Sequence, residues 1–276
     1  MFKLKKKEEK KQETAARQAA TEEILQENKS EERATAIPEN ELEEFEEFKR
    51  QKKLLEIRRL LKKIDHTLLK QTATKAELKK LCDEAIQFGF YSVCVQPVHV
   101  REVCGYLGDS NVEVACVVGF PMGENITETK VFEAKHAVAA GADEIDMVAC
   151  ISAIKNGNWS YVKREIKKVV SAAKGRPVKV ILETSLLTRD ELVKGCQCAK
   201  DGGAAFVKTS TGYFGEGATA EDIKLMKEAV KGVCSVKASG GIRNGEDFMR
   251  MLDAGADRIG TSAGVKIAED INNRYR

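Results

Sequence analysis

The feature that most constrains this chain is a regular alternation of short β-rich runs with longer helical stretches, which begins at about residue 58. Eight strands are expected, at residues 64–69, 92–95, 112–120, 144–149, 178–183, 205–209, 235–239 and 258–262. Helices are expected between them, at residues 75–88, 98–107, 127–140, 159–173, 188–201, 220–231 and 245–254. A glycine followed by an alanine separates helix from strand at three of these junctions, at Gly141, Gly203 and Gly255.

This alternation predicts an α/β fold in the form of a single parallel (β/α)8 TIM barrel. The alternative is a doubly wound open sheet, which usually carries a glycine-rich turn after its first strand. The segment at this position reads Leu-Leu-Lys-Gln-Thr-Ala and contains no glycine, which favours the barrel.

Residues 1–57 differ in composition from the rest of the chain, because they contain no glycine and no cysteine and are dense in Lys, Arg and Glu. Segments 14–28 and 40–60 have helical composition. The second carries apolar residues that could share one side of a helix: Leu42, Phe45, Phe48, Leu54, Leu55 and Ile57. We expect a charged helical or partly disordered extension over 1–57 and the barrel over 58–276. The extension is either a solvated segment or a helix for oligomerisation or for a partner.

Composition argues against several classes of function. The formal net charge of +3 is too small to indicate nucleic-acid binding, and no apolar run reaches the roughly 18 residues of a membrane span. The first residues lack the apolar stretch of a secretory signal. The eight cysteines form no CxxC pair, and there are only three histidines. We therefore expect a cytoplasmic protein with reduced thiols that uses no metal ion and no cofactor.

Two lysines end neighbouring predicted strands. Lys208 follows the apolar or small residues 204–207, and Lys237 lies on the next strand, about 4.8 Å away in a barrel. Two positive charges this close disfavour joint ionisation, so one lysine loses its proton more easily. A neutral amine attacks carbonyl carbon and forms a Schiff base. The alternative is that both lysines extend into solvent or bind a phosphate.

Further polar residues end other strands and would face the same mouth of the barrel. Asp146 is flanked by Ile145 and Met147, so it points to the opposite side from them, into the barrel. An inward carboxylate can pair with a lysine and transfer a proton. Its alternative role is a buried ion pair that only holds the barrel together. Asp65 could have either of these two roles, but the sequence supports the catalytic role less strongly for Asp65 than for Asp146.

Glycine-rich segments follow the last strands, with the sequences Ser-Gly-Gly-Ile-Arg at 239–243 and Gly-Thr-Ser-Ala-Gly at 260–264. Ser-Thr-Gly at 210–212 can join the same pocket. Barrels often bind phosphate here through backbone N–H groups and a helix N-terminus. A carbonyl-reactive lysine, a second cation, a carboxylate and an anion pocket together predict lyase or aldol chemistry on a small phosphorylated sugar.

Eight sequence blocks in order resemble the motifs of the deoxyribose-phosphate aldolase family, over about residues 58–268. Among them are Ile-Asp-His-Thr-Leu-Leu-Lys at 64–70, Glu-Ile-Asp-Met-Val at 144–148, Phe-Val-Lys-Thr-Ser-Thr-Gly at 206–212 and Val-Lys-Ala-Ser-Gly-Gly-Ile-Arg at 236–243. The resemblance implies a class I aldolase on a (β/α)8 barrel that is usually oligomeric, often dimeric. Its implied reaction is the reversible cleavage of 2-deoxy-D-ribose 5-phosphate into acetaldehyde and D-glyceraldehyde 3-phosphate.

The resemblance also implies residue roles. Lys208 is the Schiff-base lysine, Lys237 the second lysine that lowers the pKa of the first, and Asp146 part of the proton relay. The predicted substrate- and phosphate-binding residues are Asp65, Thr67, Cys94, Thr209, Gly212, Gly240, Gly241, Gly260 and Ser262. Two rival functions stay open: another Schiff-base lyase acting on a different sugar phosphate, or a catalytically silent phosphate binder.

The chain departs from the family pattern at a few positions, without losing a named catalytic group. Cys150 and Ser152 stand where Asn and Gly are usual, and Gln96 where Asn is frequent. Tyr213 follows the Ser-Thr-Gly segment, where other members carry a lysine or an aromatic residue. Ala263 replaces a serine of the phosphate loop, and we expect its backbone N–H to keep part of the phosphate binding.

Overall fold

A computed structural model describes residues 19, 21–23, 26 and 39–275, and the chain divides into two compact units, Met1–Leu54 and Leu55–Arg276. In the first unit, residues 39–54 belong to helix α2 (Glu39–Leu61), and residues 19, 21–23 and 26 are also helical. The helix predicted at 40–60 is confirmed. Most of the helix predicted at 14–28 lies outside the described residues.

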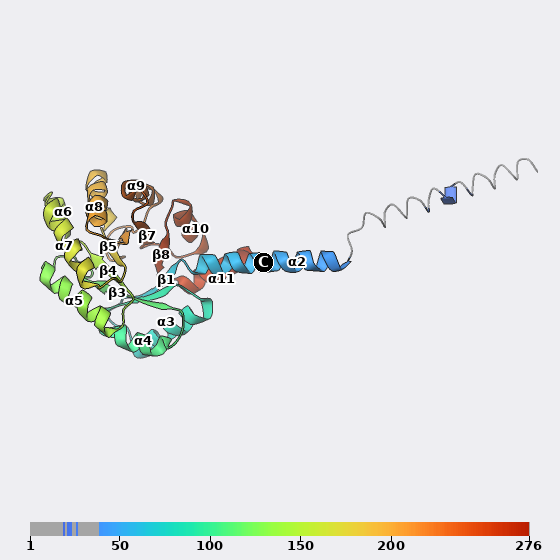
Figure 1. Ribbon diagram of the computed structural model, residues 1–276, viewed down its shortest axis with the longest axis horizontal. Coiled ribbons are helices and arrows are strands. Elements are labelled where there is room, and N and C mark those ends of the chain that lie inside the picture. The colour runs from blue at the N-terminus through green and yellow to red at the C-terminus, as the bar shows by residue number, and fades with distance from the viewer. Residues whose placement is uncertain (1–18, 20, 24–25, 27–38, 276) are drawn as a thin grey trace, which may run out of the picture. The chain divides into compact units, whose positions relative to one another are not determined.

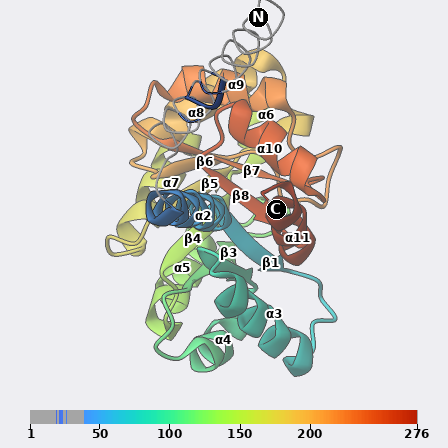
Figure 2. The same cartoon turned by 90° about the vertical axis from the view of Figure 1, so that its right-hand side faces the viewer.

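The second unit is a closed barrel of eight parallel strands that follow one another in chain order, which confirms the predicted (β/α)8 fold (Figures 1 and 2). The strands are β1 (Ile64–Leu68), β2 (Ser92–Val95), β3 (Glu113–Val118), β4 (Glu144–Val148), β5 (Val178–Ile181), β6 (Phe206–Lys208), β7 (Ser235–Ser239) and β8 (Arg258–Thr261). The helices that follow them are α3 (Lys75–Phe88), α4 (Val100–Leu107), α5 (Thr127–Ala140), α6 (Ile151–Lys155), α7 (Trp159–Ala172), α8 (Arg189–Asp201), α9 (Ala220–Val230), α10 (Gly245–Asp253) and α11 (Gly264–Arg274).

Local signals account for several helix ends. Helices α3 and α8 begin with capping boxes, in which Thr74 pairs with Glu77 and Thr188 with Glu191. Helix α5 ends at Gly141, whose φ of 114° suits a residue without a side chain. Helix α6 was not predicted, because its five residues are too few to show a helical period. None of the described helices has the length and hydrophobicity needed to cross a lipid bilayer.

The period of two along each strand divides the barrel into an apolar outer layer and a largely polar interior. Outward residues such as Ile145, Met147 and Val207 belong to the main core between strands and helices. Inward residues of β2 and β3 form a small apolar cluster that contains Cys94. The rest of the interior carries charged side chains, and these build the candidate site.

One buried ion pair outside the barrel supports the end of β4. Lys130 on α5 donates to Val148 O at 2.9 Å and to Glu165 on α7 at 2.8 Å, and both charged side chains are fully enclosed. The other oxygen of Glu165 accepts the N–H of Cys150 at 3.2 Å. The pair therefore fixes the backbone just after the strand that carries Asp146.

We expect Lys130→Met to lower the free energy of unfolding by about 3–5 kcal/mol, because it leaves the Glu165 carboxylate buried without its cation. Lys168→Met is the matched control, since the pair of Lys168 with Glu128 is solvent-exposed. Its change should stay within about 0.5 kcal/mol. Urea denaturation of both variants checks this, and equal effects from the two would contradict it.

Candidate active site

A cavity of about 420 Å³ opens at the C-terminal ends of β1, β6, β7 and β8. Its lining comes from the residues that end or follow these strands, 67–70, 208, 211–213, 239–243 and 260–262. Active sites of TIM barrels lie at this end of the strands. The cavity is therefore the candidate active site.

Lys208 joins this cavity to a buried cluster of charges. It lines the cavity, its side chain is 5% exposed, and its Nζ donates to Asp146 Oδ2 at 2.8 Å. Lys237 is its register partner on β7, as predicted, and donates to the same oxygen at 2.9 Å. The two ammonium groups thus share one carboxylate oxygen, which offsets the repulsion expected from the strand spacing.

Asp146 is the centre of the cluster. Its Oδ1 accepts from Lys179 on β5 at 2.8 Å, so three lysines from neighbouring strands contact one fully buried carboxylate. Lys237 also contacts Asp65 on β1. The inward orientation predicted for Asp146 from its apolar neighbours is confirmed.

A second group of charged residues lies next to these. Lys179 contacts Glu144 at 2.5 Å, and Arg258 on β8 contacts Asp65 at 2.8 Å and Glu144 at 3.3 Å. Sequence reasoning missed Lys179, Glu144 and Arg258. The signal was present, since Lys179 stands between two strand valines just as Lys208 and Lys237 stand in apolar runs.

Charge pairing decides the ionisation of these groups. Burial raises the pKa of Asp146, but Lys179, Lys208 and Lys237 outweigh it and hold that pKa well below its usual value. Burial lowers the pKa of Lys237, yet Asp146 and Asp65 raise it above the usual value. At neutral pH Asp146 is therefore an anion and Lys237 a cation.

Most of the predicted phosphate residues line the cavity: Thr67, Gly212, Gly240, Gly241, Gly260 and Ser262. At Gly240, φ is 88° and an added Cβ would lie 2.9 Å from the Cα of Gly217, so the loops after β6 and β7 approach too closely for a side chain. At Gly260, a Cβ would lie 2.9 Å from Cε of Lys237. Glycine there leaves room for the lysine stem.

Three of the predicted substrate- and phosphate-binding residues are not brought to the cavity lining, and neither are Asp146 and Lys237, which lie in the buried cluster. Asp65 is fully buried and pairs with Lys237 and Arg258. Cys94 is enclosed in the inner apolar cluster, and burial raises the pKa of its thiol to about 11. Thr209 links β6 to β7, because its hydroxyl donates to Ser239 O and accepts from Ser239 N, both at 3.0 Å.

The departures from the family pattern have structural partners. Gln96 and Tyr213 both donate to the carbonyl oxygen of Leu69, at 3.1 and 2.9 Å, at the rim of the cavity. The N–H of Ala263, expected to be available to a phosphate, instead donates to Thr261 Oγ1 at 2.9 Å.

Cys150 and Ser152 lie outside the cavity lining and share one acceptor. The thiol of Cys150 donates to Glu124 at 3.7 Å, and the Ser152 hydroxyl donates to the same carboxylate at 2.5 Å. The two departures therefore form one local hydrogen-bond group at the start of α6.

Two cations of the cavity were also missed as site residues, Lys70 and Arg243. Arg243 directly follows the glycine pair of the β7 loop, which was the available signal. Lys70 pairs with Glu77 at the start of α3. Together with Lys208 they give the cavity a positive lining that suits an anionic substrate.

Glu183, at the end of β5, holds the loop after β6. Its Oε2 accepts from the N–H and the hydroxyl of Thr211, at 3.1 and 2.5 Å, whereas its Oε1 is buried without a partner among the described residues. Its φ of 54° is unusual for a residue with a side chain. Burial raises the pKa of Glu183 above its usual value.

This raised pKa gives a pH-dependent prediction. A carboxyl group whose pKa is higher in the folded state stabilises the fold below its unfolded pKa of about 4.5, and this contribution is lost as the pH rises through the folded pKa. Glu183→Gln stays neutral, so its stability relative to wild type should increase from pH 5 to pH 8. Glu191→Gln should show no such trend between pH 5 and pH 8, because hydrogen bonds from Lys155 and Thr188 lower the pKa of Glu191 and keep it ionised in both states over this range. Urea midpoints across this pH range test the prediction, which would be wrong if the Glu183→Gln difference stayed flat or if Glu191→Gln showed the same rise.

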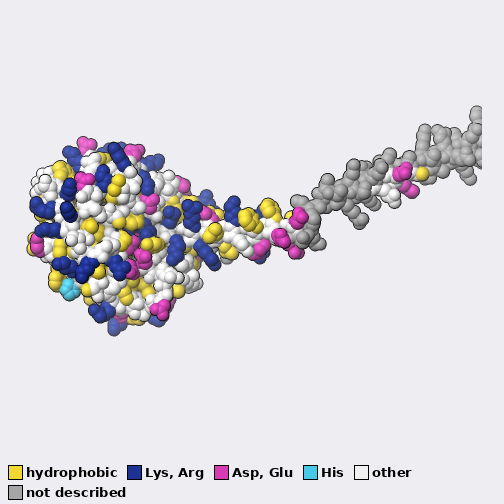
Figure 3. All heavy atoms as spheres, in the orientation of Figure 1, with side chains coloured by type: hydrophobic (Ala, Val, Ile, Leu, Met, Phe, Trp, Pro, Cys, Tyr) yellow, Lys and Arg dark blue, Asp and Glu magenta, His cyan; other side chains and the backbone are white. Residues whose placement is uncertain are grey.

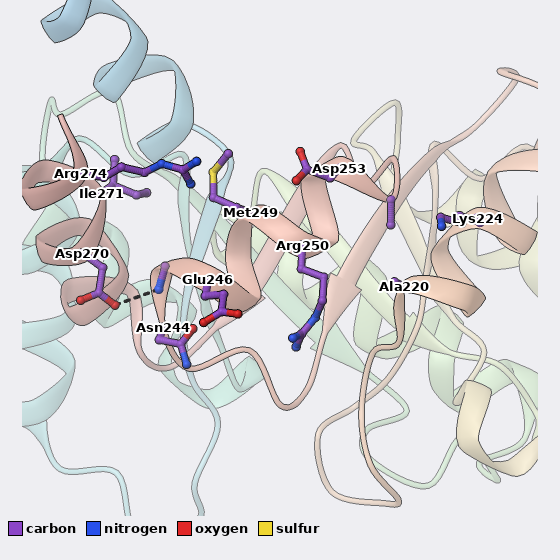
Figure 4. A pocket seen from close by; sticks show the side chains of 12 residues that line it. Ala220, Lys224, Asn244, Glu246, Met249, Arg250, Asp253, Asp270, Ile271 and Arg274 are labelled. Carbon is purple, nitrogen blue, oxygen red and sulfur yellow. Dashed lines mark hydrogen bonds between the residues drawn. The ribbon is translucent and has the colours of Figure 1, made fainter.

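A second cavity of about 810 Å³ lies on the outer surface, among α9, α10 and α11 (Figure 4). Its lining includes Asp270, which accepts the N–H of Gly245 at 2.8 Å. None of the barrel strands contributes to it. Although it is larger, it contains none of the strand-end lysines, so we assign the chemistry to the smaller cavity.

A closed barrel with a lysine–carboxylate cluster at the carboxyl ends of its strands defines a TIM-barrel enzyme. The family described as DeoC/LacD family aldolases matches residues 59–271, and the chain belongs to this family. It is an aldolase, a carbon–carbon lyase.

Individual proteins that are similar to this chain support the same family assignment. A deoxyribose-phosphate aldolase of Thermoanaerobacter is 56% identical over 216 residues, covering 77% of this chain and 97% of the relative. One from Thermococcus gammatolerans is 54% identical over 218 residues, covering 78% and 97%. A crystal structure of a putative deoxyribose-phosphate aldolase from Coccidioides immitis has a TM-score of 0.77 at 43% identity, covering 78% of this chain and 87% of that one. A tetrameric deoxyribose phosphate aldolase from Aeropyrum pernix has a TM-score of 0.74 at 36% identity, covering 79% and 93%.

Proposed function

We propose that this aldolase reversibly cleaves 2-deoxy-D-ribose 5-phosphate to D-glyceraldehyde 3-phosphate and acetaldehyde through a Schiff base on Lys208. The observation that carries the proposal is the position of Lys208. It lines the cavity, contacts Asp146 at 2.8 Å, and is next to a glycine-rich, positively charged lining that suits a phosphate. The names of the relatives support the choice of substrate.

Lys208 is better suited than its neighbours to act as the neutral amine. When all groups are ionised, the cluster contains Lys179, Lys208, Lys237 and Arg258 against Asp65, Glu144 and Asp146, one more cation than carboxylates. Loss of one proton makes the number of cations in the cluster equal to the number of carboxylates. Lys208 contacts one carboxylate, Lys237 two and Lys179 three, so deprotonation of Lys208 disturbs the fewest ion pairs.

The neutral amine attacks C1 of the open-chain sugar, and loss of water together with uptake of one proton from solvent gives the protonated imine. Asp146, through a water molecule, accepts the proton of the C3 hydroxyl. The C2–C3 bond then breaks, its electrons form the enamine, and glyceraldehyde 3-phosphate leaves. A proton returned to C2 regenerates the imine, and water hydrolyses it to acetaldehyde and free Lys208. Lys237 stays protonated beside Asp146 and stabilises the negative charge on the relay.

Borohydride trapping tests the proposal. The protein is incubated with acetaldehyde, reduced, digested and analysed by peptide mass spectrometry. We expect a two-carbon adduct on Lys208 and none on Lys237, and we expect turnover of deoxyribose 5-phosphate above that of other sugar phosphates. An adduct on Lys237 would reverse the roles of the two lysines. No adduct on either lysine would overturn the Schiff base on Lys208, and a different preferred sugar phosphate would favour another Schiff-base lyase.

Three further features belong to the same proposal. Residues 58–276 form the aldolase domain, so deleting residues 1–57 should leave turnover unchanged. The protein forms a homo-oligomer, with a dimer as the expected state, and the oligomeric relative supports association. It works in the cytoplasm, which agrees with the unpaired state of all eight cysteines.

A further inference from the structure

Helix α2 carries an exposed apolar stripe that no described part of the chain covers. Every side chain from residue 41 to 55 is exposed. Leu42, Phe45, Phe48 and Leu55 are 50–68% exposed, and the helical period places them within one side of the helix. Large aromatic side chains left in water on one helix face indicate an interaction surface. The family match starts only at residue 59, so the aldolase barrel does not account for this stripe.

The charges of α2 are separated along its length. Residues 39–47 contain six Glu and no basic residue, whereas residues 48–61 contain six Lys or Arg and a single Glu. Figure 3 shows the acidic side chains at the N-terminal end of the helix and the basic ones along its C-terminal part. A helix with one acidic and one basic half is complementary in charge to a copy of itself in the antiparallel orientation. The two helix dipoles then point in opposite directions, which is also favourable.

We propose that the 39–54 segment of α2 pairs with the same segment of a second copy of this chain, antiparallel and with the two-fold axis beside Phe48. In such an isologous contact, a residue that precedes Phe48 by a given number of positions lies opposite the residue that follows Phe48 by the same number in the second copy. Glu44 then lies opposite Lys52 of the second copy, and Phe48 meets Phe48. Glu41 and Glu46 come within one turn of Lys53 and Lys49 of the second copy.

Glu41, Lys49 and Lys52 lie on the same side of the helix as the stripe, whereas Glu44, Glu46 and Lys53 flank it. Lys49 Nζ lies 4.3 Å from the centre of the Phe45 ring, which shows that Lys49 is on the same side of the helix as Phe45. Lys49 also pairs with Glu46 of its own helix at 2.8 Å. An exposed pair of this kind contributes little to stability, so it exchanges readily for a partner across an interface.

The test uses the full-length protein and two charge-reversal variants. One is Glu41→Lys/Glu44→Lys/Glu46→Lys, and the other is Lys49→Glu/Lys52→Glu/Lys53→Glu. Each alone should lose this association and show half the wild-type mass in sedimentation velocity. An equimolar mixture should restore the wild-type mass, because the two altered helices are again complementary. Aldolase turnover, measured alongside, should be unchanged in all three samples, which separates this proposal from the catalytic one.

Cysteine cross-linking supplies an independent readout. Phe48→Cys should form a disulfide between residues 48 of two copies, identified by peptide mass spectrometry, while Glu43→Cys on the opposite side of the helix should not. The proposal is overturned if both charge-reversal variants keep the wild-type mass, if mixing them restores nothing, or if position 43 cross-links as efficiently as position 48. A wild-type protein that stays monomeric across a concentration series would assign the stripe to another partner.

Discussion

Replacing Lys208 by Met is expected to lower kcat by at least about 10⁴-fold, because the substitution removes the nucleophile and leaves only binding and the remaining electrostatics. Stability should be nearly unchanged or should rise. Asp146 keeps Lys179 and Lys237 as partners, and an almost enclosed charge is replaced by an apolar side chain of similar length. Steady-state turnover of deoxyribose 5-phosphate and urea denaturation measure the two effects.

Lys208→Arg is the matched control for charge. It keeps a cation beside Asp146 but cannot form an imine, because a guanidinium group stays protonated. The arginine variant should be as inactive as the methionine variant and should give no adduct after borohydride reduction. If it retained a tenth or more of wild-type turnover, Lys208 would be an electrostatic residue and the covalent mechanism would be wrong.

The second large effect is expected at Asp146. Asp146→Asn removes the carboxylate on which three buried lysines converge and should destabilise the protein by about 3–5 kcal/mol. It should also lower kcat by about 10²–10⁴-fold, since Lys208 loses its carboxylate partner and the proton relay loses its base. Because the folded-state pKa of Asp146 is well below its usual value, its stabilising contribution is present above the unfolded pKa of about 3.8 and is lost as the pH falls below it.

Asp65→Asn separates catalysis from stability at this cluster. Asp65 is equally buried and pairs with Lys237 and Arg258, but it does not contact Lys208. Its loss should cost a similar amount of stability and reduce kcat much less than the change at Asp146. Equal losses of kcat in the two variants would show that Asp146 acts only by holding the barrel together, the alternative left open by the sequence.

The electrostatics of the site differ from those expected from the lysine pair alone. Strand spacing predicts that Lys237 acts on Lys208 as a bare like charge. In the structure Asp146 accepts hydrogen bonds from both, and Asp65 holds Lys237 as a cation. The two lysines therefore have different carboxylate partners, and these partners influence their charge states together with the repulsion between the lysines.

What the sequence by itself determined is local. The alternation of strands and helices predicted the barrel and put Lys208 and Lys237 at the ends of neighbouring strands. The period of two placed Asp146 on the inner side. The glycine-rich segments marked the loops that line the cavity, because loops that approach one another this closely exclude side chains.

What only the tertiary structure decided is which inward side chains meet. Closure of the barrel brings Asp65 to Lys237, 172 residues further along the chain, and places both in the buried cluster instead of the cavity lining. It also adds Lys179 to the partners of Asp146. Strand periodicity gives the side of the sheet on which a residue lies, but depth inside the barrel and contacts across it depend on strand stagger and side-chain length, which no local pattern encodes.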